Sequence, residues 1–313
     1  MTRRLKKMKE KFEDCKKSCI FATTRKNLHL LLIYSFMKQN KFFSRLLLMA
    51  GAMVCTLGVA TSCGGGDDDV IPEPTPEPTP EKKLENKTFT AGDVSFTMVA
   101  VEGGTFKMGA PDADTEASDY EKPQHAVTLS DYYIGATEVT QALWEAVMGS
   151  NPSNLKGDKL PVKGVSWDDC QVFITKLNTM TGQTFRLPTE AEWEYSARGG
   201  KKTQGYKYSG SNDISLVAWY EDNSEDAPHE VGTKAANELG IFDMSGNVSE
   251  WCQDWFGNYS SEAQTNPTGP EMGSFRVYRG GCWQETGRDC RVSMRGGGAQ
   301  NHSGQDLGLR LAQ

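Results

Sequence analysis

The segment RLPTEAEWEYSARGG, residues 186–200, contains the signals that decide how this chain folds. Thr189 followed three residues later by Glu192 forms a capping box, in which each side chain bonds a backbone N–H at the start of a helix. Pro188 stands directly before the box, and Gly199-Gly200 follows where a short helix would end. We therefore expect a helix that begins after Thr189 and ends before the glycine pair.

Two more helices are expected upstream of this segment. Ser166 and Asp169 form a second capping box, followed by apolar residues at helical spacing. Thr140 can cap a helix that runs to about Met148, and Gly149 can close it. The chain thus predicts a few short helices separated by long connections.

The acidic residues of these helices could be mistaken for catalytic carboxylate pairs. They are Asp168 and Asp169 in one helix and Glu190, Glu192 and Glu194 in the other. Capping together with an exposed helix face explains them better, because acidic residues favour the first turn of a helix. The four histidines are scattered and show no metal-ligand spacing.

Short strands are predicted outside the helices. Residues 96–109 alternate partly between apolar and polar side chains and are broken by Gly103-Gly104, which predicts a hairpin. Residues 125–129 and 132–134 are further short strands. With 32 glycines among 313 residues, the composition favours a loop-rich fold over a helical bundle or a doubly wound sheet.

The N-terminal part of the chain is typical of an export signal. A basic segment from Met37 to Arg45 precedes an apolar run from Leu46 to Ala60, which is too short for a comfortable transmembrane helix. Thr61-Ser62-Cys63 resembles a lipobox, which predicts lipidation of Cys63; a plain secretory signal is the alternative. Residues 1–62 are thus leader and signal peptide, and residues 1–36 read as a start-site artefact.

Residues 63–84 are predicted to be a tether. The acidic run Asp67–Asp69 after Cys63 resembles the export tag of surface lipoproteins in the Bacteroides group, and a solvated spacer is the alternative. Alternating prolines over residues 70–82 favour polyproline II, which extends about 3 Å per residue. We expect an outer-membrane protein, lipid-anchored and exposed at the cell surface.

The charge is distributed unevenly between leader and domain. Residues 1–62 hold 13 of the 34 basic and 3 of the 41 acidic residues, so residues 63–313 carry 21 basic against 38 acidic, a net −17. A surface this acidic repels phosphate backbones, so nucleic acid is excluded as an expected partner.

The domain, residues 85–313, resembles the formylglycine-generating enzyme (sulfatase-modifying factor) family. The resemblance rests on ordered blocks of sequence over about residues 95–313, namely residues 103–109, 138–141, 161–167, 186–200, 237–251, 279–281 and 306–310. It implies a compact, loop-rich α+β fold that is related to C-type lectins.

The catalytic branch of this family oxidises a sulfatase cysteine to formylglycine with copper(I) held by two cysteines. Aligned from Gly280-Gly281, the second family cysteine falls on Cys290 and the first on Glu285. A carboxylate is a poor substitute for a soft thiolate toward copper(I). Cys282 lies eight residues before Cys290 and is the other thiol near this loop. No catalytic residue is therefore assigned.

The resemblance also implies a calcium site. The matching segment would bind Ca²⁺ through carboxylates of Asp243 and Glu250 and backbone carbonyls of Gly246 and Val248. These hard oxygen donors around a tight glycine turn suit calcium. A turn held by hydrogen bonds alone is the alternative.

Disulfides are plausible in an exported domain that contains Cys170, Cys252, Cys282 and Cys290. The sequence leaves three connectivities open; the resemblance favours Cys252 with Cys290, and buried free thiols are the alternative.

The function expected is a binding or scaffold module for a protein or glycan at the cell surface. A copper-dependent oxidase of sulfatase cysteines is the alternative.

Overall fold

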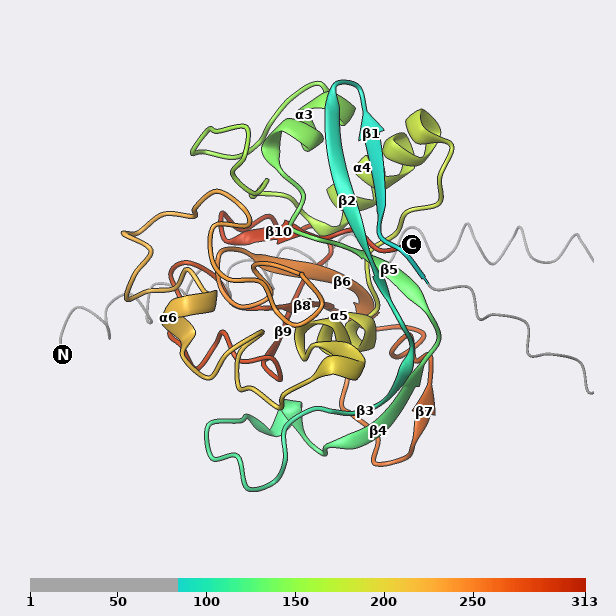
Figure 1. The fold of residues 1–313 in the computed structure, drawn as a ribbon, viewed down its shortest axis with the longest axis vertical. Helices are drawn as coiled ribbons and strands as arrows, with labels where there is room; N and C mark the ends of the chain where they lie inside the picture. The colour runs from blue at the N-terminus through green and yellow to red at the C-terminus, as the bar shows by residue number, and fades with distance from the viewer. Residues whose placement is uncertain (1–83) are drawn as a thin grey trace, which may run out of the picture. The chain divides into compact units, whose positions relative to one another are not determined.

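The computed structural model describes residues 84–313 (Figure 1). The predicted export signal, Cys63 and most of the proline-rich tether lie outside these residues. Within the described range, no helix is both long and apolar enough to span a bilayer. The helices and strands are short, and residues 198–248 consist almost entirely of turns and irregular backbone. The α+β, loop-rich class expected from the sequence is confirmed.

Ten strands form three small sheets in the described range. The first sheet has the order β1-β2-β5, the second β3-β4-β7 and the third β10-β6-β8-β9. The bounds are β1 Lys87–Ala91, β2 Val94–Val101, β3 Gly104–Met108, β4 His125–Leu129, β5 Tyr132–Gly135, β6 Ser249–Trp255, β7 Gln264–Thr265, β8 Arg276–Arg279, β9 Arg295–Gly298 and β10 Leu307–Leu309.

The expected hairpin over residues 96–109 is wrong in its pairing, although both strands exist. β2 pairs with β1 and β5, whereas β3 pairs with β4 in another sheet. The chain changes sheets at Gly103, where an added Cβ would collide with the backbone of Leu129 and Ser130. Strand propensity is local, but the choice of partner depends on β4 and β5, which follow more than twenty residues later.

Three helices begin where the capping residues predicted, namely α3 Gln141–Met148, α4 Trp167–Thr181 and α5 Glu190–Ala197. Three shorter helices were not predicted, namely η1 Asp119–Glu121, η2 Gly200–Lys202 and α6 Ile214–Val217. Ser166 and Thr189 each accept the N3 backbone N–H while the N3 carboxylate bonds back, so both capping boxes are confirmed. Thr140 caps α3, and Gly149 ends it with a left-handed φ of 78°.

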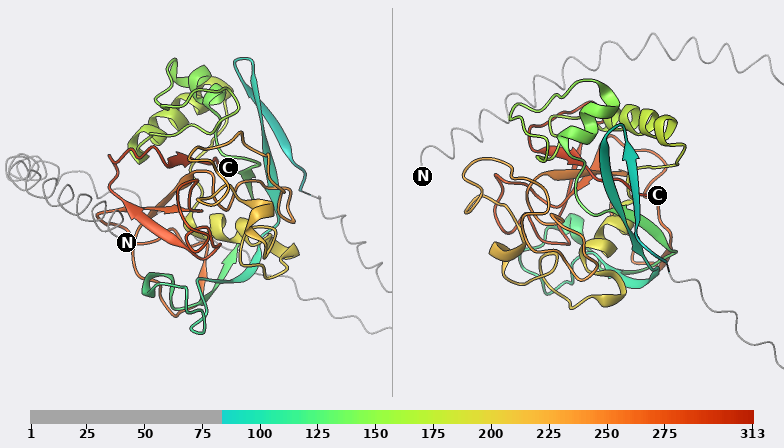
Figure 2. Two further views of the ribbon diagram at one scale, coloured as in Figure 1. Left: turned by 90° about the vertical axis from the view of Figure 1, so that its left-hand side faces the viewer. Right: turned by 45° about the horizontal axis from the view of Figure 1, so that its top comes forward.

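Two hydrophobic cores support the fold. One lies where α3 and α4 pack against β1 and β2, with Trp144 stacked on Phe173 at 4.8 Å between ring centroids (Figures 1 and 2). The other surrounds α5, whose Trp193 and Tyr195 are buried against β3, β6 and β8. Helix α5 therefore sits inside the molecule.

Residues 307–313 run through the middle of the domain. β10 pairs in parallel with β6. Beyond it, Ala312 exchanges backbone hydrogen bonds with Arg186, and Gln313 with Tyr133. Residues 307–313 thus connect β6, β5 and Arg186, which precedes α5.

Candidate functional site

The loop that was predicted to correspond to the family's redox site follows β8. Gly281 adopts φ +71°, and an added Cβ would lie 2.6 Å from the Asp289 carbonyl oxygen and 2.9 Å from the Cys290 sulfur. The far end of the loop therefore packs directly against its start. This close return brings Cys282, Glu285 and Cys290 into one neighbourhood.

Both thiols of this loop are held in their protonated form. Cys290 is fully buried and packs against Tyr208 and Val217. Burial first, and then the nearby Glu285 carboxylate, raise the pKa of Cys290 and of Cys282 far above that of a free thiol. Since the thiolate is the nucleophile and the metal ligand, neither sulfur is activated.

Hydrogen bonds with Cys282 compensate the Glu285 carboxyl only in part. Burial, followed by repulsion from Asp289 and Asp306, raises the pKa of the Glu285 carboxyl to about 7. Its Oε2 atom is buried and has no hydrogen-bond partner among the described residues. A carboxyl group beside one protonated thiol does not fit the two-thiolate site that copper(I) requires.

The structure places three more residues, Lys163, Trp283 and Asp306, in this neighbourhood. Lys163 is buried, and its ammonium lies 5.4 Å from the centroid of the Trp283 ring. Burial lowers the pKa of Lys163, which Asp306 opposes. The indole Nε1 of Trp283 is buried without a partner in the described part of the chain. Lys163 and Asp306 lie over 140 residues apart, so no local motif could have joined them.

The predicted calcium segment forms a tight turn. Gly246 has φ +80°, and an added Cβ would collide with the Trp219 carbonyl group. Asp243 is buried with a left-handed φ of 59°, and its Oδ2 accepts the Gly232 N–H at 2.6 Å. Burial raises the pKa of Asp243 to about 6.

The carboxylate of Glu250 is already bonded within the protein. Arg310 donates to Oε1 at 2.6 Å and to Oε2 at 2.9 Å, and the Trp193 indole donates to Oε2 at 2.7 Å. Glu250 and Arg310 are both fully buried. Arg310 thus already compensates the charge of one carboxylate that the predicted cation would use.

Glu138 is a third acid beside this turn. It accepts the Val248 N–H and the Asn247 side-chain amide, and burial, followed by repulsion from Asp243, raises its pKa. Over residues 84–313, no three His, Cys, Asp or Glu side chains are arranged to hold a metal ion. Calcium at Asp243, Gly246, Val248 and Glu250 stays a prediction.

The expected exposed acidic face of α5 is wrong. Glu190, Glu192 and Glu194 are all buried. Glu190 is bonded by Arg295 through two contacts of 2.6 Å, and Glu194 by Arg279 at 2.6 Å. The arginines follow the glutamates by 85 to 105 residues in sequence. Ion pairs link five residues here, Glu190, Glu194, Arg198, Arg279 and Arg295, and we call this set the α5 ion network.

The disulfide prediction is also wrong. Cys170, Cys252, Cys282 and Cys290 are all free, buried thiols. Cys252 belongs to the core around α5, whereas Cys290 belongs to a separate cluster with Tyr208. The buried-thiol alternative is the one that the structure shows.

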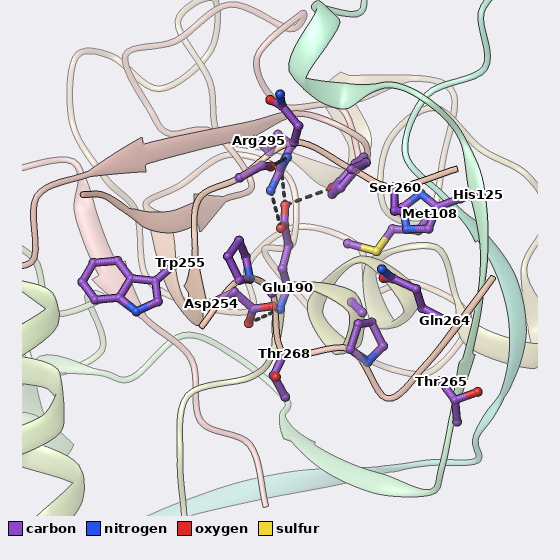
Figure 3. A pocket seen from close by; sticks show the side chains of 17 residues that line it. Met108, His125, Glu190, Asp254, Trp255, Ser260, Gln264, Thr265, Thr268 and Arg295 are labelled. Carbon is purple, nitrogen blue, oxygen red and sulfur yellow. Dashed lines mark hydrogen bonds and ion pairs between the residues drawn. The ribbon is translucent and has the colours of Figure 1, made fainter. Parts of the chain in front are cut away.

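A cavity of about 520 Å³ opens beside the α5 ion network (Figure 3). Glu190 and Asp254 lie at its inner side, and Arg295 closes over Glu190. Burial, and then repulsion from Glu190, raise the pKa of Asp254 to about 7. Cys282, Glu285 and Cys290 do not line this cavity. The sequence reasoning missed it, because its walls come from β3, β4, α5, β6, β7 and β9.

Comparison with curated proteins gives relatives with three kinds of name, among them serine/threonine-protein kinase Pkn1 of Chlamydia trachomatis, which is 31% identical over 228 residues, covering 63% of this chain and 35% of the relative. The chain is 37% identical over 270 residues to the chaperone protein LppX of Paenibacillus barcinonensis, covering 70% of this chain and 90% of the relative. It is 28% identical over 295 residues to the formylglycine-generating enzyme of Thermomonospora curvata, covering 70% of this chain and 94% of that enzyme.

Solved structures show the same architecture. Treponema denticola variable protein 1 matches with a TM-score of 0.67 and 34% identity, covering 72% of this chain and 98% of that one. PvdO from Pseudomonas aeruginosa matches with a TM-score of 0.60 and 25% identity, covering 74% and 98%. Residues 85–313 match the family described as sulfatase-modifying factor enzyme 1-like domain. The chain therefore belongs to the sulfatase-modifying factor family, which is the membership that its sequence blocks predicted.

Proposed function

We propose that this protein is a lipid-anchored surface protein whose family domain binds or scaffolds a partner and no longer oxidises cysteine. One observation carries the proposal. At the two positions where the family's oxidases hold copper(I), this chain has the buried carboxyl of Glu285 and the buried, protonated thiol of Cys290. The oxygens of Glu285 are hard donors and the thiol of Cys290 is protonated, so these two groups suit copper(I) poorly.

The relatives support a role in binding. LppX is named as a chaperone, a role in which a protein acts by holding another molecule. The relatives named as formylglycine-generating enzymes are less similar in sequence, at 28% to 29% identity. The partner class proposed is a protein or a glycan at the cell surface.

The oxidase alternative is tested with the purified protein, copper(I), air and a Cys-x-Pro-x-Arg peptide. We expect mass spectrometry to find the peptide unmodified, because no pair of thiolates is present. Glu285→Cys is expected to bind copper(I) more tightly than the unmutated protein, since Cys290 and its loop are retained. Peptide aldehyde formed by the unmutated protein and abolished by Cys290→Ser would show that the binding proposal is wrong.

The anchor is tested separately. Replacing Cys63 with alanine should abolish labelling by a radioactive fatty acid and release the protein from membrane fractions. The same protein with Cys55→Ala is the matched control, because Cys55 lies within the predicted signal and should not be modified. Unchanged membrane attachment of the Cys63→Ala variant would contradict lipidation.

A further inference from the structure

Two surface hollows meet at Asn258 and Tyr259. The inner hollow, of about 520 Å³, is the cavity beside the α5 ion network. The outer hollow, of about 760 Å³, lies under the segment that contains Tyr120 and Pro123. Both are lined by Asn258 and Tyr259, and we call them together the Tyr259 groove. Each hollow lies in the size range of small-molecule sites, so the groove can seat an elongated ligand with several units.

The charges of the inner hollow are compensated within the protein. Both oxygens of Glu190 are bonded by Arg295, and the Tyr259 hydroxyl donates to Oε1 at 3.0 Å. The Arg295 guanidinium also lies 4.0 Å from the centroid of the Tyr259 ring. The outer hollow contains one lysine, Lys122, and one aspartate, Asp119. Apart from Asp254, the groove therefore offers no unbalanced charge to attract a phosphate or an ammonium group.

Neutral hydrogen-bonding side chains make up much of the remaining wall. The inner hollow is lined by two amides and three hydroxyls, from Asn258, Ser260, Gln264, Thr265 and Thr268. In Figure 3, Gln264 and Thr268 lie on the side of the hollow opposite Arg295. Amides and hydroxyls both donate and accept, which matches a ligand whose groups do the same.

Asp254 adds one carboxyl to this wall. Its Oδ2 accepts the Glu190 N–H at 2.9 Å. Asp254 is 4% exposed and lines the hollow. A carboxyl group has room for several hydrogen bonds, so this one can also bond a ligand in the hollow. A hydroxyl group is a suitable partner at either protonation state of the acid.

An exposed aromatic ring stands at the outer hollow. Tyr120 is 57% exposed, and its ring packs edge-on against Phe256 with centroids 5.5 Å apart. The contact holds the ring while much of it faces solvent. A rigid aromatic face next to neutral hydrogen-bonding groups is suited to a ligand that has both C–H and hydroxyl surfaces.

An extended peptide fits this groove less well. The neighbouring edge strand β7 has two residues, Gln264 and Thr265, so strand addition would gain few backbone hydrogen bonds. Pro267 and Pro270 follow in the same wall and have no N–H to donate. The wall thus binds through side chains more than through backbone.

We propose that the Tyr259 groove binds a neutral oligosaccharide, with Tyr120 stacked on one sugar ring and Asp254 and Gln264 bonding hydroxyls of another. This inference rests on the proposed binding function and names its ligand class. An uncharged sugar chain combines apolar ring faces with many hydroxyls, and it requires no counter-charge from the protein.

The probes are four neutral tetrasaccharides, cellotetraose, maltotetraose, mannotetraose and chitotetraose, titrated into the purified protein by calorimetry. We expect at least one to bind with a Kd below about 1 mM. Tyr120→Ala and Gln264→Ala should each weaken that binding by about tenfold, as truncation of a contact residue does. Phe275→Ala is the matched control, because Phe275 is also an exposed aromatic (51%) but lines neither hollow, and it should leave the Kd unchanged.

Two results would overturn the proposal. One is that none of the four sugars binds to protein that still unfolds cooperatively. The other is that an uncharged Ala-Gln repeat peptide binds with the same dependence on Tyr120 and Gln264 while the sugars do not. Either result leaves the proposed function standing, because that function is tested separately, by the peptide-oxidation assay on the same preparation and by the membrane attachment of Cys63→Ala.

Discussion

Two buried polar regions meet at the end of β8, and they differ in how well their charges are matched. In the α5 ion network, Glu194 receives Gly109 N–H and Arg198 on one oxygen and Arg279 on the other. In the loop that begins after Arg279, the buried atoms Trp283 Nε1 and Glu285 Oε2 have no partner in the described range. The network itself has one such atom, Arg279 Nε.

The difference indicates which part of the fold is constrained by stability. Buried ions are tolerated when geometry and hydrogen bonds compensate their lost hydration, so the network can serve as scaffold. Unmatched buried groups are rare in folded proteins and concentrate where function sets the residue. Stability therefore explains the α5 ion network, whereas it does not explain the residues of the loop after Arg279.

The largest effect is expected from breaking the network. Arg279→Ala leaves Glu194 and Glu190 with less compensation inside the protein and should lower the free energy of unfolding by about 3–5 kcal/mol. Urea unfolding followed by tryptophan fluorescence measures it. Lys201→Ala is the control, because its pair with Glu102 is exposed and should contribute about 0–1 kcal/mol. A loss from Arg279→Ala as small as the control's would show that the network is not structural.

A smaller effect is expected at the turn near the network. If calcium binds at Asp243 and Glu250, removing it with chelator should lower the melting temperature, since a ligand at a hundredfold excess over Kd stabilises by about 2.7 kcal/mol. Asp243→Asn should flatten that response while keeping the left-handed backbone, which asparagine tolerates. A melting curve that chelator and Ca²⁺ leave unchanged would mean that Arg310 alone compensates Glu250.

The smallest effect on stability is expected from Glu285, in the loop after β8. The pKa of Glu285 is raised from 4.5 to about 7 on folding, so its proton is held more tightly by the folded chain. Its contribution to stability is fully present below pH 4.5 and is lost as pH rises through 7. Between pH 5 and pH 8 the unmutated protein should lose on the order of 2 kcal/mol more than Glu285→Gln.

Urea unfolding of both proteins at several pH values gives this difference. Asp254 also has a raised pKa, but it is present in both proteins and cancels. Parallel curves for the two proteins would show that Glu285 is solvated or paired in solution.

The sequence predicted the features that depend on neighbouring residues. The capping boxes at Ser166 and Thr189 formed because each needs only residues three positions apart. The sequence blocks that resemble the family predicted the fold class, because chains that share long blocks in the same order share a fold. β4 and β5 also appeared at the expected residues.

The features that depend on distant partners were not predicted. Helix α5 carries three glutamates, and only the arrival of Arg279 and Arg295 nearly a hundred residues later makes their burial favourable. The cavity beside Asp254 likewise has walls from six elements. Periodicity describes one element at a time and gives no information about such assemblies.

The central path of residues 307–313 has a consequence for the order of assembly. The charge of Glu250 lacks its arginine partner until Arg310 reaches it, and Arg186 and Tyr133 lack backbone partners until Ala312 and Gln313 arrive. The core around α3 and α4, which contains Leu307, Leu309 and Leu311, is therefore complete only when this segment has docked.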